Sequence, residues 1–181
     1  MDTTQRPADI LRHGQVELRR WRPFHIGPLD RLITESRDHL LPTMPFVAGH
    51  DRRQGEAFLA WCEEQWAAGH AYLYAIRCDG ETVGSCALMR TAAPGGLDIG
   101  YWLHRSWTGR GLATMAAAAL VDAGRRLPYV ERIEIHHDQA NHASGAVARR
   151  LGFTEVARVL VPWGQETPGS TGVDVYWRLI A

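Results

Sequence analysis

Hydrophobic and polar residues alternate in several short stretches of the chain, as they do in β-strands with one buried face. The first stretch is QVELRRW, residues 15–21, in which Val16 and Leu18 share a face. Two longer apolar runs flank Asp79-Gly80, a pair that accepts the positive φ angles of a type I′ turn, so the runs predict a β-hairpin. Further strands are expected over residues 97–103, 131–138, 153–161 and 173–180.

Apolar residues recur at helical spacing in four other segments. These segments are 29–40, 52–69, the alanine-rich stretch after Gly111, and 142–151. Gly69 and Gly152 stand at the ends of two of them, where glycine commonly ends a helix. Trp61 and Trp66 are both expected to pack in the core. An antiparallel first half followed by a strand–helix–strand second half predicts an α+β fold with a mixed sheet.

Composition limits the function classes. A chain of 181 residues suits one domain, residues 1–181, and 45% hydrophobic residues can build a core. The 20 basic and 20 acidic residues cancel, so no general attraction to nucleic acid or to an anionic membrane is expected. The longest apolar stretch, around 116–121, is too short to span a bilayer, and the first residues lack the apolar segment of a signal peptide.

Three cysteines, Cys62, Cys78 and Cys86, are odd in number and not closely paired. This spacing argues against a disulfide framework and against a zinc site. We therefore expect buried or half-buried thiols and a cytoplasmic protein.

A glycine-rich turn, Gly109-Arg110-Gly111, joins the strand 97–103 to the alanine-rich helix. Because a helix N-terminus carries unpaired N–H groups and glycines allow close approach, the turn suits an anion such as phosphate. Four arginines against one acidic residue give residues 104–126 a local charge of +3. A tight strand-to-helix connection with solvated arginines explains the same residues, so the turn alone does not decide between the two.

Two common phosphate-binding motifs do not match this turn. No Gly-Lys-Ser/Thr ends it, which excludes a P-loop. The dinucleotide pattern G-x-G-x-x-G needs a third glycine where Thr114 stands, although Glu134 or His136 could serve as its ribose-binding group. That pattern also belongs to the first βα unit of a doubly wound sheet, whereas here about a hundred residues precede it.

Two longer segments carry a family resemblance: DIGYWLHRSWTGRGLATMAAAAL, residues 98–120, and RIEIHHDQANHASGAVARRLGF, residues 132–153. Together they resemble the GCN5-related N-acetyltransferases (GNAT), and within them the ribosomal-protein N-terminal acetyltransferases of the RimJ/RimL kind. The resemblance covers nearly the whole chain. It implies the GNAT fold, with a mixed, mostly antiparallel sheet of six to seven strands, flanking helices and a parallel pair of strands that splay apart, 99–103 and 133–137.

The resemblance also implies acetyl-CoA as cosubstrate. The family's pyrophosphate motif Q/R-x-x-G-x-G/A corresponds to residues 108–113, where Thr108 departs from the usual first residue. The pantetheine arm is expected between the splayed strands, with Asn141 as a hydrogen-bond partner; from the residues themselves, Asn141 is also a helix N-cap. The residues expected to hold the cosubstrate are Tyr101, Trp102, Leu103, Thr108, Gly109, Arg110, Gly111, Leu112, Ala113, Thr114 and Asn141.

Acetyl transfer needs a base for the ammonium proton, a donor for the oxyanion and an acid for the thiolate. The resemblance implies Ser144 as the acid. Glu134 is the candidate base, although a purely structural carboxylate explains it equally well, and His136 and His142 are alternatives. Adjacent strand residues face opposite sides of a sheet, so His136 and His137 are not expected to bind one metal ion with His142.

The sequence leaves the acceptor open between the α-amine of a protein N-terminus and a small-molecule amine such as an antibiotic; a non-catalytic acyl-CoA-binding module is the third reading. The acceptor side is expected from loop 42–47, the start of the first helix and loop 164–172. Too few carboxylates stand there for a polycationic antibiotic, which favours a peptide amine or a small amine of low charge. A homodimer is left open. The charged groups expected there are Arg37, Asp38, His39 and Glu166.

Overall fold

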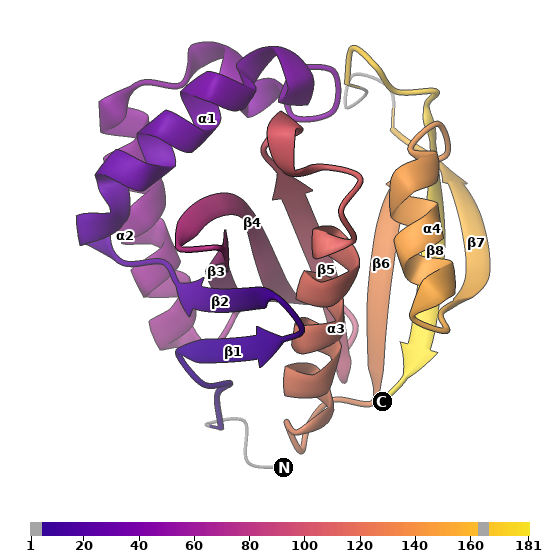
Figure 1. The fold of residues 1–181 in the computed structure, drawn as a ribbon. Coiled ribbons are helices and arrows are strands. Elements are labelled where there is room, and N and C mark those ends of the chain that lie inside the picture. Colours follow the sequence, from indigo (N-terminus) through magenta and orange to yellow (C-terminus); the bar gives the residue numbers. More distant parts are fainter. Residues whose placement is uncertain (1–4, 163–166) are drawn as a thin grey trace.

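A computed structural model describes residues 5–162 and 167–181 as one sheet with helices on both faces (Figure 1). The sheet order is β1-β2-β3-β4-β5-β6-β8-β7. The strands are β1 (Ile10–His13), β2 (Val16–Arg20), β3 (Ala71–Cys78), β4 (Glu81–Arg90), β5 (Gly96–Leu103), β6 (Arg132–Asp138), β7 (Thr154–Leu160) and β8 (Val173–Ile180). The helices are α1 (Ile26–Leu40), α2 (Arg52–Ala68), α3 (Leu112–Arg125) and α4 (His142–Arg150), with short 3-10 helices η1 (Pro23–His25), η2 (Pro45–Gly49) and η3 (Arg105–Trp107).

All neighbouring strands in the sheet are antiparallel except β5 and β6, which are parallel. The mixed α+β sheet is therefore confirmed, but its eight strands exceed the expected six to seven. The additional strand is β1, which pairs with β2 at the sheet edge. Because β1 has only four residues and three of them are exposed, it carries no alternating pattern that could predict it.

Helices cover the two faces of the sheet in pairs, and each face has its own core, although Trp66 near the end of α2 packs in the core on the α3–α4 side. α3 and α4 pack on one face and α1 and α2 on the other (Figure 1). In β3 successive residues supply both cores: Tyr72, Tyr74 and Ile76 face α3, whereas Leu73 and Ala75 face the core under α1 and α2. A strand buried on both faces reads as a continuous apolar run, which is the pattern of this segment.

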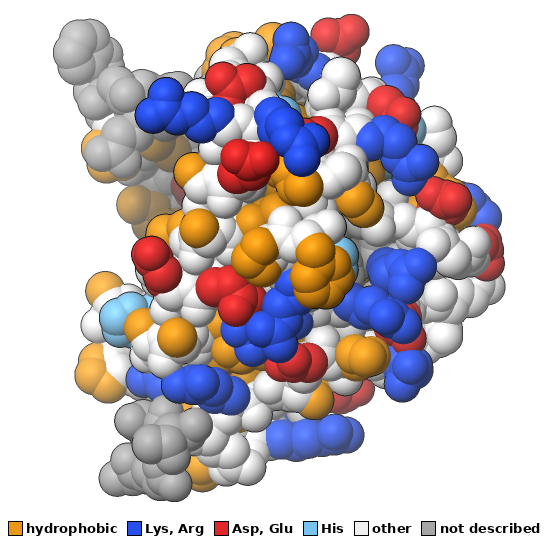
Figure 2. Space-filling view, turned by 90° about the vertical axis from the view of Figure 1, so that its left-hand side faces the viewer, with side chains coloured by type: hydrophobic (Ala, Val, Ile, Leu, Met, Phe, Trp, Pro, Cys, Tyr) orange, Lys and Arg blue, Asp and Glu red, His pale blue; other side chains and the backbone are white. Residues whose placement is uncertain are grey.

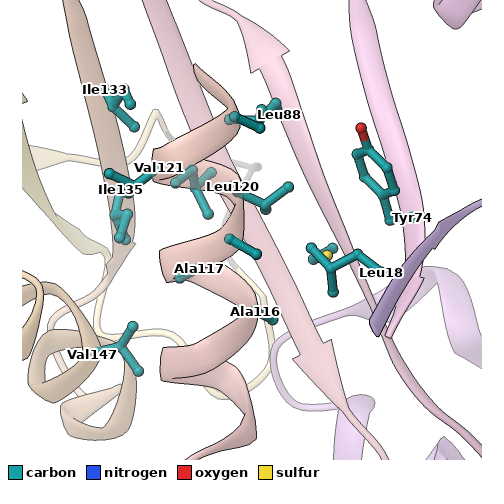
Figure 3. Close-up of a cluster of buried hydrophobic side chains, with 14 of the residues drawn as sticks. Leu18, Tyr74, Leu88, Ala116, Ala117, Leu120, Val121, Ile133, Ile135 and Val147 are labelled. Carbon is teal, nitrogen blue, oxygen red and sulfur yellow. The ribbon is translucent and has the colours of Figure 1, made fainter. Parts of the chain in front are cut away.

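Small residues let α3 lie close to the sheet. Figure 3 shows Ala116, Ala117 and Leu120 of α3 directed toward the strands, and all three are fully buried. At Gly124 an added Cβ would lie 3.0 Å from the Cδ1 atom of Ile133. The alanine-rich composition thus fixes a short distance between α3 and the strands that carry the site.

The hairpin and the helix ends agree with the sequence. Asp79 and Gly80 have φ angles of 52° and 82°, the positive values that a type I′ turn requires. Gly69 caps α2 with φ 71°. α1 begins at Ile26, earlier than expected, because Pro28 falls in its first turn, where proline is tolerated.

Only one of the two tryptophans of α2 is in the core. Trp66 is buried, but Trp61 is 41% exposed and stacks on Phe58. Five residues of α-helix separate the two side chains by about 140° around the axis, so both cannot face the sheet. The buried stripe instead follows Leu59, Cys62 and Trp66.

The surface fits the neutral composition. On the face shown in Figure 2, arginine and acidic side chains are interspersed rather than gathered by sign. The three cysteines are buried and unbonded. No helix within residues 5–162 and 167–181 has the length and apolar character needed to cross a membrane.

Candidate functional site

A cleft lies where β5 and β6 separate. The two strands pair only over Gly96–Asp98 and Arg132–Glu134, and beyond this point they diverge, as the resemblance implies. The cleft has a volume of ≈ 390 Å³. Both Ile99 and Gly100 line it, and successive strand residues point to opposite faces, so the cleft passes through the sheet.

On the α3–α4 side the cleft is bounded by the start of α4. Asn141 caps this helix as expected: its side-chain oxygen accepts a hydrogen bond from the Ser144 N–H at 3.1 Å. Asn141 and Ser144 both line the cleft, as does Tyr101 of β5. The Tyr101 hydroxyl approaches the Ser144 carbonyl oxygen at 3.5 Å, and burial raises the pKa of Tyr101. The structure therefore brings three predicted site residues together.

The glycine turn precedes α3 in a conformation that only glycine adopts freely. Gly109 and Gly111 have φ angles of 74° and 76°, and Gly111 is the N-cap residue. An added Cβ at Gly109 would meet nothing within 4 Å, so the backbone there faces open space. No side chain caps α3, and its first N–H groups therefore lack a side-chain acceptor.

The other residues predicted to bind the cosubstrate differ in their exposure. Thr108 is exposed and donates its hydroxyl to the Arg105 carbonyl at 2.8 Å. The Arg110 guanidinium lies 4.5 Å from the Trp107 ring centroid. Leu112 is buried, so only its backbone can reach a ligand, and Ala113 and Thr114 are half-buried.

Two predicted residues on β5 lie past the point where β6 diverges. Trp102 and Leu103 pair with Ser85 and Gly84 of β4. The Leu103 side chain is buried in the core. Neither side chain lines the cleft, so their contribution to it would be backbone groups on the β6 side of the strand.

Glu134, the candidate base, lies at the last paired position, just before the split. Its Oε1 atom accepts hydrogen bonds from Arg132 at 3.2 Å and from Arg178 at 2.9 Å. The side chain is 14% exposed and does not line the cleft. The structure does not bring Glu134 together with Ser144, and its assignment as the base stays a prediction.

A different group of polar residues lines the cleft on the opposite side of the sheet. A hydrogen bond of 3.0 Å joins the Nδ1 atom of His136 to the Oδ1 atom of Asp98, and the His136 ring stacks on Tyr176 with ring centroids 5.3 Å apart. The hydrogen bond to Asp98 raises the pKa of His136, against an opposing effect of burial. Asp174 of β8 also lines the cleft.

Sequence reasoning missed Asp98 and Asp174. Both are single carboxylates within apolar strands, Asp98 between Leu97 and Ile99 and Asp174 between Val173 and Val175. An isolated acidic residue in such a strand is a usable signal of a functional site, because burial of an unpaired charge costs free energy. That signal does not predict the strand order and register that place β5 and β8 on either side of β6.

The two expected acceptor loops meet at the cleft. Thr43 and Met44 line it from the first loop, and Thr167 and Ser170 from the second. The Gly169 N–H donates to the Pro42 carbonyl at 2.8 Å, which ties the loops together. Glu166 lies outside the described residues. The three charged residues at the end of α1, Arg37, Asp38 and His39, do not line the cleft.

His142, an alternative base, lines another cavity. This cavity of ≈ 420 Å³ lies beside α4, against Trp177 of β8, and shares His137 with the lining of the cleft. The Trp177 Nε1–H donates to His137 Nε2 at 2.9 Å. Among residues 5–162 and 167–181, no three His, Cys, Asp or Glu side chains are grouped to hold a metal ion.

Comparisons with known proteins agree with this geometry. RimL, a ribosomal alpha-N-protein acetyltransferase in complex with coenzyme A, is 23% identical, with a TM-score of 0.85 over 94% of this chain and 97% of its own. Mycobacterium smegmatis RimJ is 25% identical, with a TM-score of 0.82 over 95% of this chain and 86% of its own. The microcin self-immunity acetyltransferase MccE, in complex with acetyl-CoA and AMP, is 19% identical, with a TM-score of 0.83 over 92% and 93%.

No curated protein matches the chain. The family model of the acetyltransferase (GNAT) domain matches residues 15–154, most of the 181. The parallel pair that splays at Asp98 and Glu134 is the feature that the family resemblance implies. The chain belongs to the GNAT acetyltransferases.

Proposed function

We propose that this protein transfers the acetyl group of acetyl-CoA to a primary amine, and that the amine is the α-amine of a peptide or protein. The observation that carries the proposal is the cleft through the sheet between β5 and β6. Asn141 and Ser144 border it on one side, and carboxylates border it on the other. A cosubstrate and an acceptor can therefore approach one point from opposite faces.

The residues present fit acetyl-CoA. A pyrophosphate would bind the uncapped N-terminus of α3, where Gly109 and Gly111 leave room for close approach to the backbone. Beyond Asp98 and Glu134, β5 and β6 no longer pair with each other, so the edges that face each other carry peptide groups without a strand partner. A pantetheine arm carries amide groups that can pair with such an edge. Structures of RimL and MccE contain CoA and acetyl-CoA, which supports the same cosubstrate here.

The chain's own residues supply positioning and proton transfer. The Asn141 Oδ1 atom is used for capping, so its amide NH₂ remains to donate to the pantetheine. This cap fixes the first turn of α4 and with it Ser144. The Ser144 hydroxyl donates a proton toward the leaving thiolate, the role that the resemblance implies for it. The amine attacks from the opposite face of the sheet.

The acceptor side suits an amine of low total charge. Asp98 and Asp174 can attract one ammonium group, and Met44, Met89 and Val161 add an apolar part to the lining. A third carboxylate of the lining, Asp138, accepts hydrogen bonds from the Ala140 and Thr171 N–H groups. The two others are few for a polycationic aminoglycoside but enough for a peptide N-terminus with a small first side chain. A Salmonella typhimurium neighbour, 23% identical, is described as modifying the N-terminal serine of a ribosomal protein, which supports a peptide acceptor.

A small-molecule amine is the second candidate. The hydrogen bond from the Gly169 N–H to the Pro42 carbonyl joins the two loops that line the cleft, and the cleft volume of ≈ 390 Å³ suits a small amine. MccE, with a similar fold, is described as a self-immunity acetyltransferase bound to AMP. A non-catalytic acyl-CoA-binding module is the third possibility, and turnover of any amine would exclude it.

A thiol-release assay with acetyl-CoA tests the proposal. The panel consists of peptides that begin with Ser, Ala or Thr, the same peptides with a blocked N-terminus, nucleoside-type amines and an aminoglycoside. We expect release only with free peptide N-termini and one acetyl group per peptide by mass spectrometry. Turnover of the aminoglycoside without turnover of any peptide would contradict the peptide assignment.

A further inference from the structure

We propose that His136 is the proton acceptor for the incoming ammonium group and that Asp98 positions it. The inference rests on the proposed acetyl transfer and replaces Glu134 in the role of base. It assigns a residue pair that sits on the acceptor side of the cleft, on two different strands that meet at the split.

Geometry separates His136 from Glu134. Both side chains lie on the same face of β6, two residues apart, but only His136 lines the cleft. Glu134 is held by Arg132 and Arg178, whose guanidinium groups occupy its Oε1 atom. His136 has a half-exposed side chain, 44% of it open to solvent. A base must reach the substrate, and His136 meets this condition.

Asp98 selects the useful tautomer of the imidazole. The carboxylate is acceptor-only when ionised, so the neutral ring must carry its hydrogen on Nδ1, 3.0 Å from Asp98 Oδ1. The Nε2 atom then keeps a lone pair, and within residues 5–162 and 167–181 it has no hydrogen-bond partner. Stacking on Tyr176 holds the plane of the ring. The same carboxylate stabilises the imidazolium that forms when Nε2 takes a proton.

Three carboxylates around His136 shift its pKa in the same direction. Asp98 of β5, Asp174 of β8 and Glu134 of β6 itself all raise the pKa of His136, whereas burial lowers it. Two further titratable side chains lie near His136: Asp138, two residues along β6, lines the same cleft, and Tyr176 has a pKa that is raised by burial and by the same three carboxylates. Acceptance of a proton at Nε2 is thus favoured, and the neutral base becomes available as the pH rises through this raised pKa.

The proton balance is complete with these groups. The peptide ammonium gives one proton to His136 Nε2 and becomes a neutral amine. Its nitrogen forms the C–N bond to the thioester carbonyl, and the C–S bond breaks. The thiolate takes a proton from the Ser144 hydroxyl. The nitrogen then loses its second proton, which restores the Ser144 hydroxyl. The imidazolium releases its proton to solvent through the open side of the cleft.

The test compares His136→Gln, Asp98→Asn and Glu134→Gln with His70→Gln, an exposed histidine in the turn before β3, as the matched control. The acceptor is the peptide that the wild type acetylates or, if it acetylates none, the best small amine of the panel. We expect His136→Gln to lower kcat/KM about 100-fold, with CoA affinity retained and His70→Gln unaffected. Asp98→Asn should lower kcat/KM and move the acid limb of the pH profile to lower pH, which a purely structural role would not do.

Two results would overturn the assignment. One is a His136→Gln enzyme with an unchanged rate and pH profile; the other is a larger loss with Glu134→Gln than with His136→Gln. An NMR titration of the His136 ring needs no acceptor. It should give a pKa above that of an ordinary histidine, lowered in Asp98→Asn, and identical titration in both proteins would refute the pairing. If the wild type acetylates small amines but no peptide, the peptide assignment fails while the role of His136 is still decided by these variants.

Discussion

The glycine at the start of α3 offers a quantitative test of how the protein binds its cosubstrate. Gly111 has a φ of 76°, and an alanine Cβ there would meet only the Met115 Cε atom, at 3.7 Å. Gly69, which follows the last residue of α2, matches it in backbone conformation and in available space, although it is buried: φ is 71° and the nearest atom, the Tyr72 hydroxyl oxygen, lies at 3.5 Å. Gly111→Ala and Gly69→Ala therefore impose the same backbone strain without a steric clash.

That strain sets the expected loss of stability. A left-handed conformation costs an L-residue about 1–2 kcal/mol. For a chain of this length each kcal/mol lowers Tm by roughly 2–4 °C. Both variants should thus melt about 2–8 °C below the wild type in the absence of ligand. Equal decreases in Tm would show that the two substitutions impose the same backbone strain.

Ligand binding should separate the two variants. Acetyl-CoA at about 100 times its Kd adds about 2.7 kcal/mol to the stability of the folded state, whereas a tenfold weaker site gains only about half as much at the same concentration. The Cβ of Gly111→Ala would stand beside the N–H groups that a pyrophosphate must approach, so we expect at least about a tenfold rise in Kd. Gly69→Ala should keep the wild-type Kd.

Isothermal calorimetry and thermal melts with and without CoA measure both quantities. A Gly111→Ala protein that binds CoA as tightly as Gly69→Ala and the wild type would refute the reasoning, because backbone approach at α3 would then contribute nothing to affinity. Equal weakening in both variants would point to a global effect of strain.

Three further predictions concern the same site. Ser144→Ala should bind CoA with nearly the wild-type Kd but lower kcat by about 100-fold, since it removes a proton donor; steady-state kinetics over a pH series checks this, and unchanged turnover would remove Ser144 from the mechanism. Asn141→Ala should lose about 1 kcal/mol of unfolding free energy with its N-cap, whereas Asn141→Asp should keep the cap and weaken CoA binding through the lost NH₂ donor; chemical denaturation and calorimetry separate the two effects. NADH should bind far more weakly than CoA in a direct calorimetric comparison, and tighter NADH binding would contradict the assignment of residues 108–113.

The sequence by itself determined the elements with strong local signals. The Asp79-Gly80 turn was predictable because few residues accept two successive positive φ angles. Alternation placed Val16 and Leu18 on the buried face of β2, and both are buried. The Asn141 cap was readable because a side chain bonded to the N–H three residues later is a local interaction. The short edge strand β1 has no such pattern.

Sequence spacing along α2 shows the limit of this reasoning. A broad apolar stripe could not tell which of Trp61 and Trp66 faces the sheet, because the answer depends on the rotation of the helix about its axis. That rotation is set by packing against β3 and not by the helix itself.

The acceptor side of the cleft was decided by tertiary structure alone. Asp98, His136 and Asp174 come from three strands, and they meet because of the strand order β5-β6-β8 and its register. Glu134 and His136 share a face of β6, and only the point at which β5 leaves β6 determines which of them opens into the cleft. Strand order and register arise from long-range packing, and no local pattern in the chain encodes the position of that split.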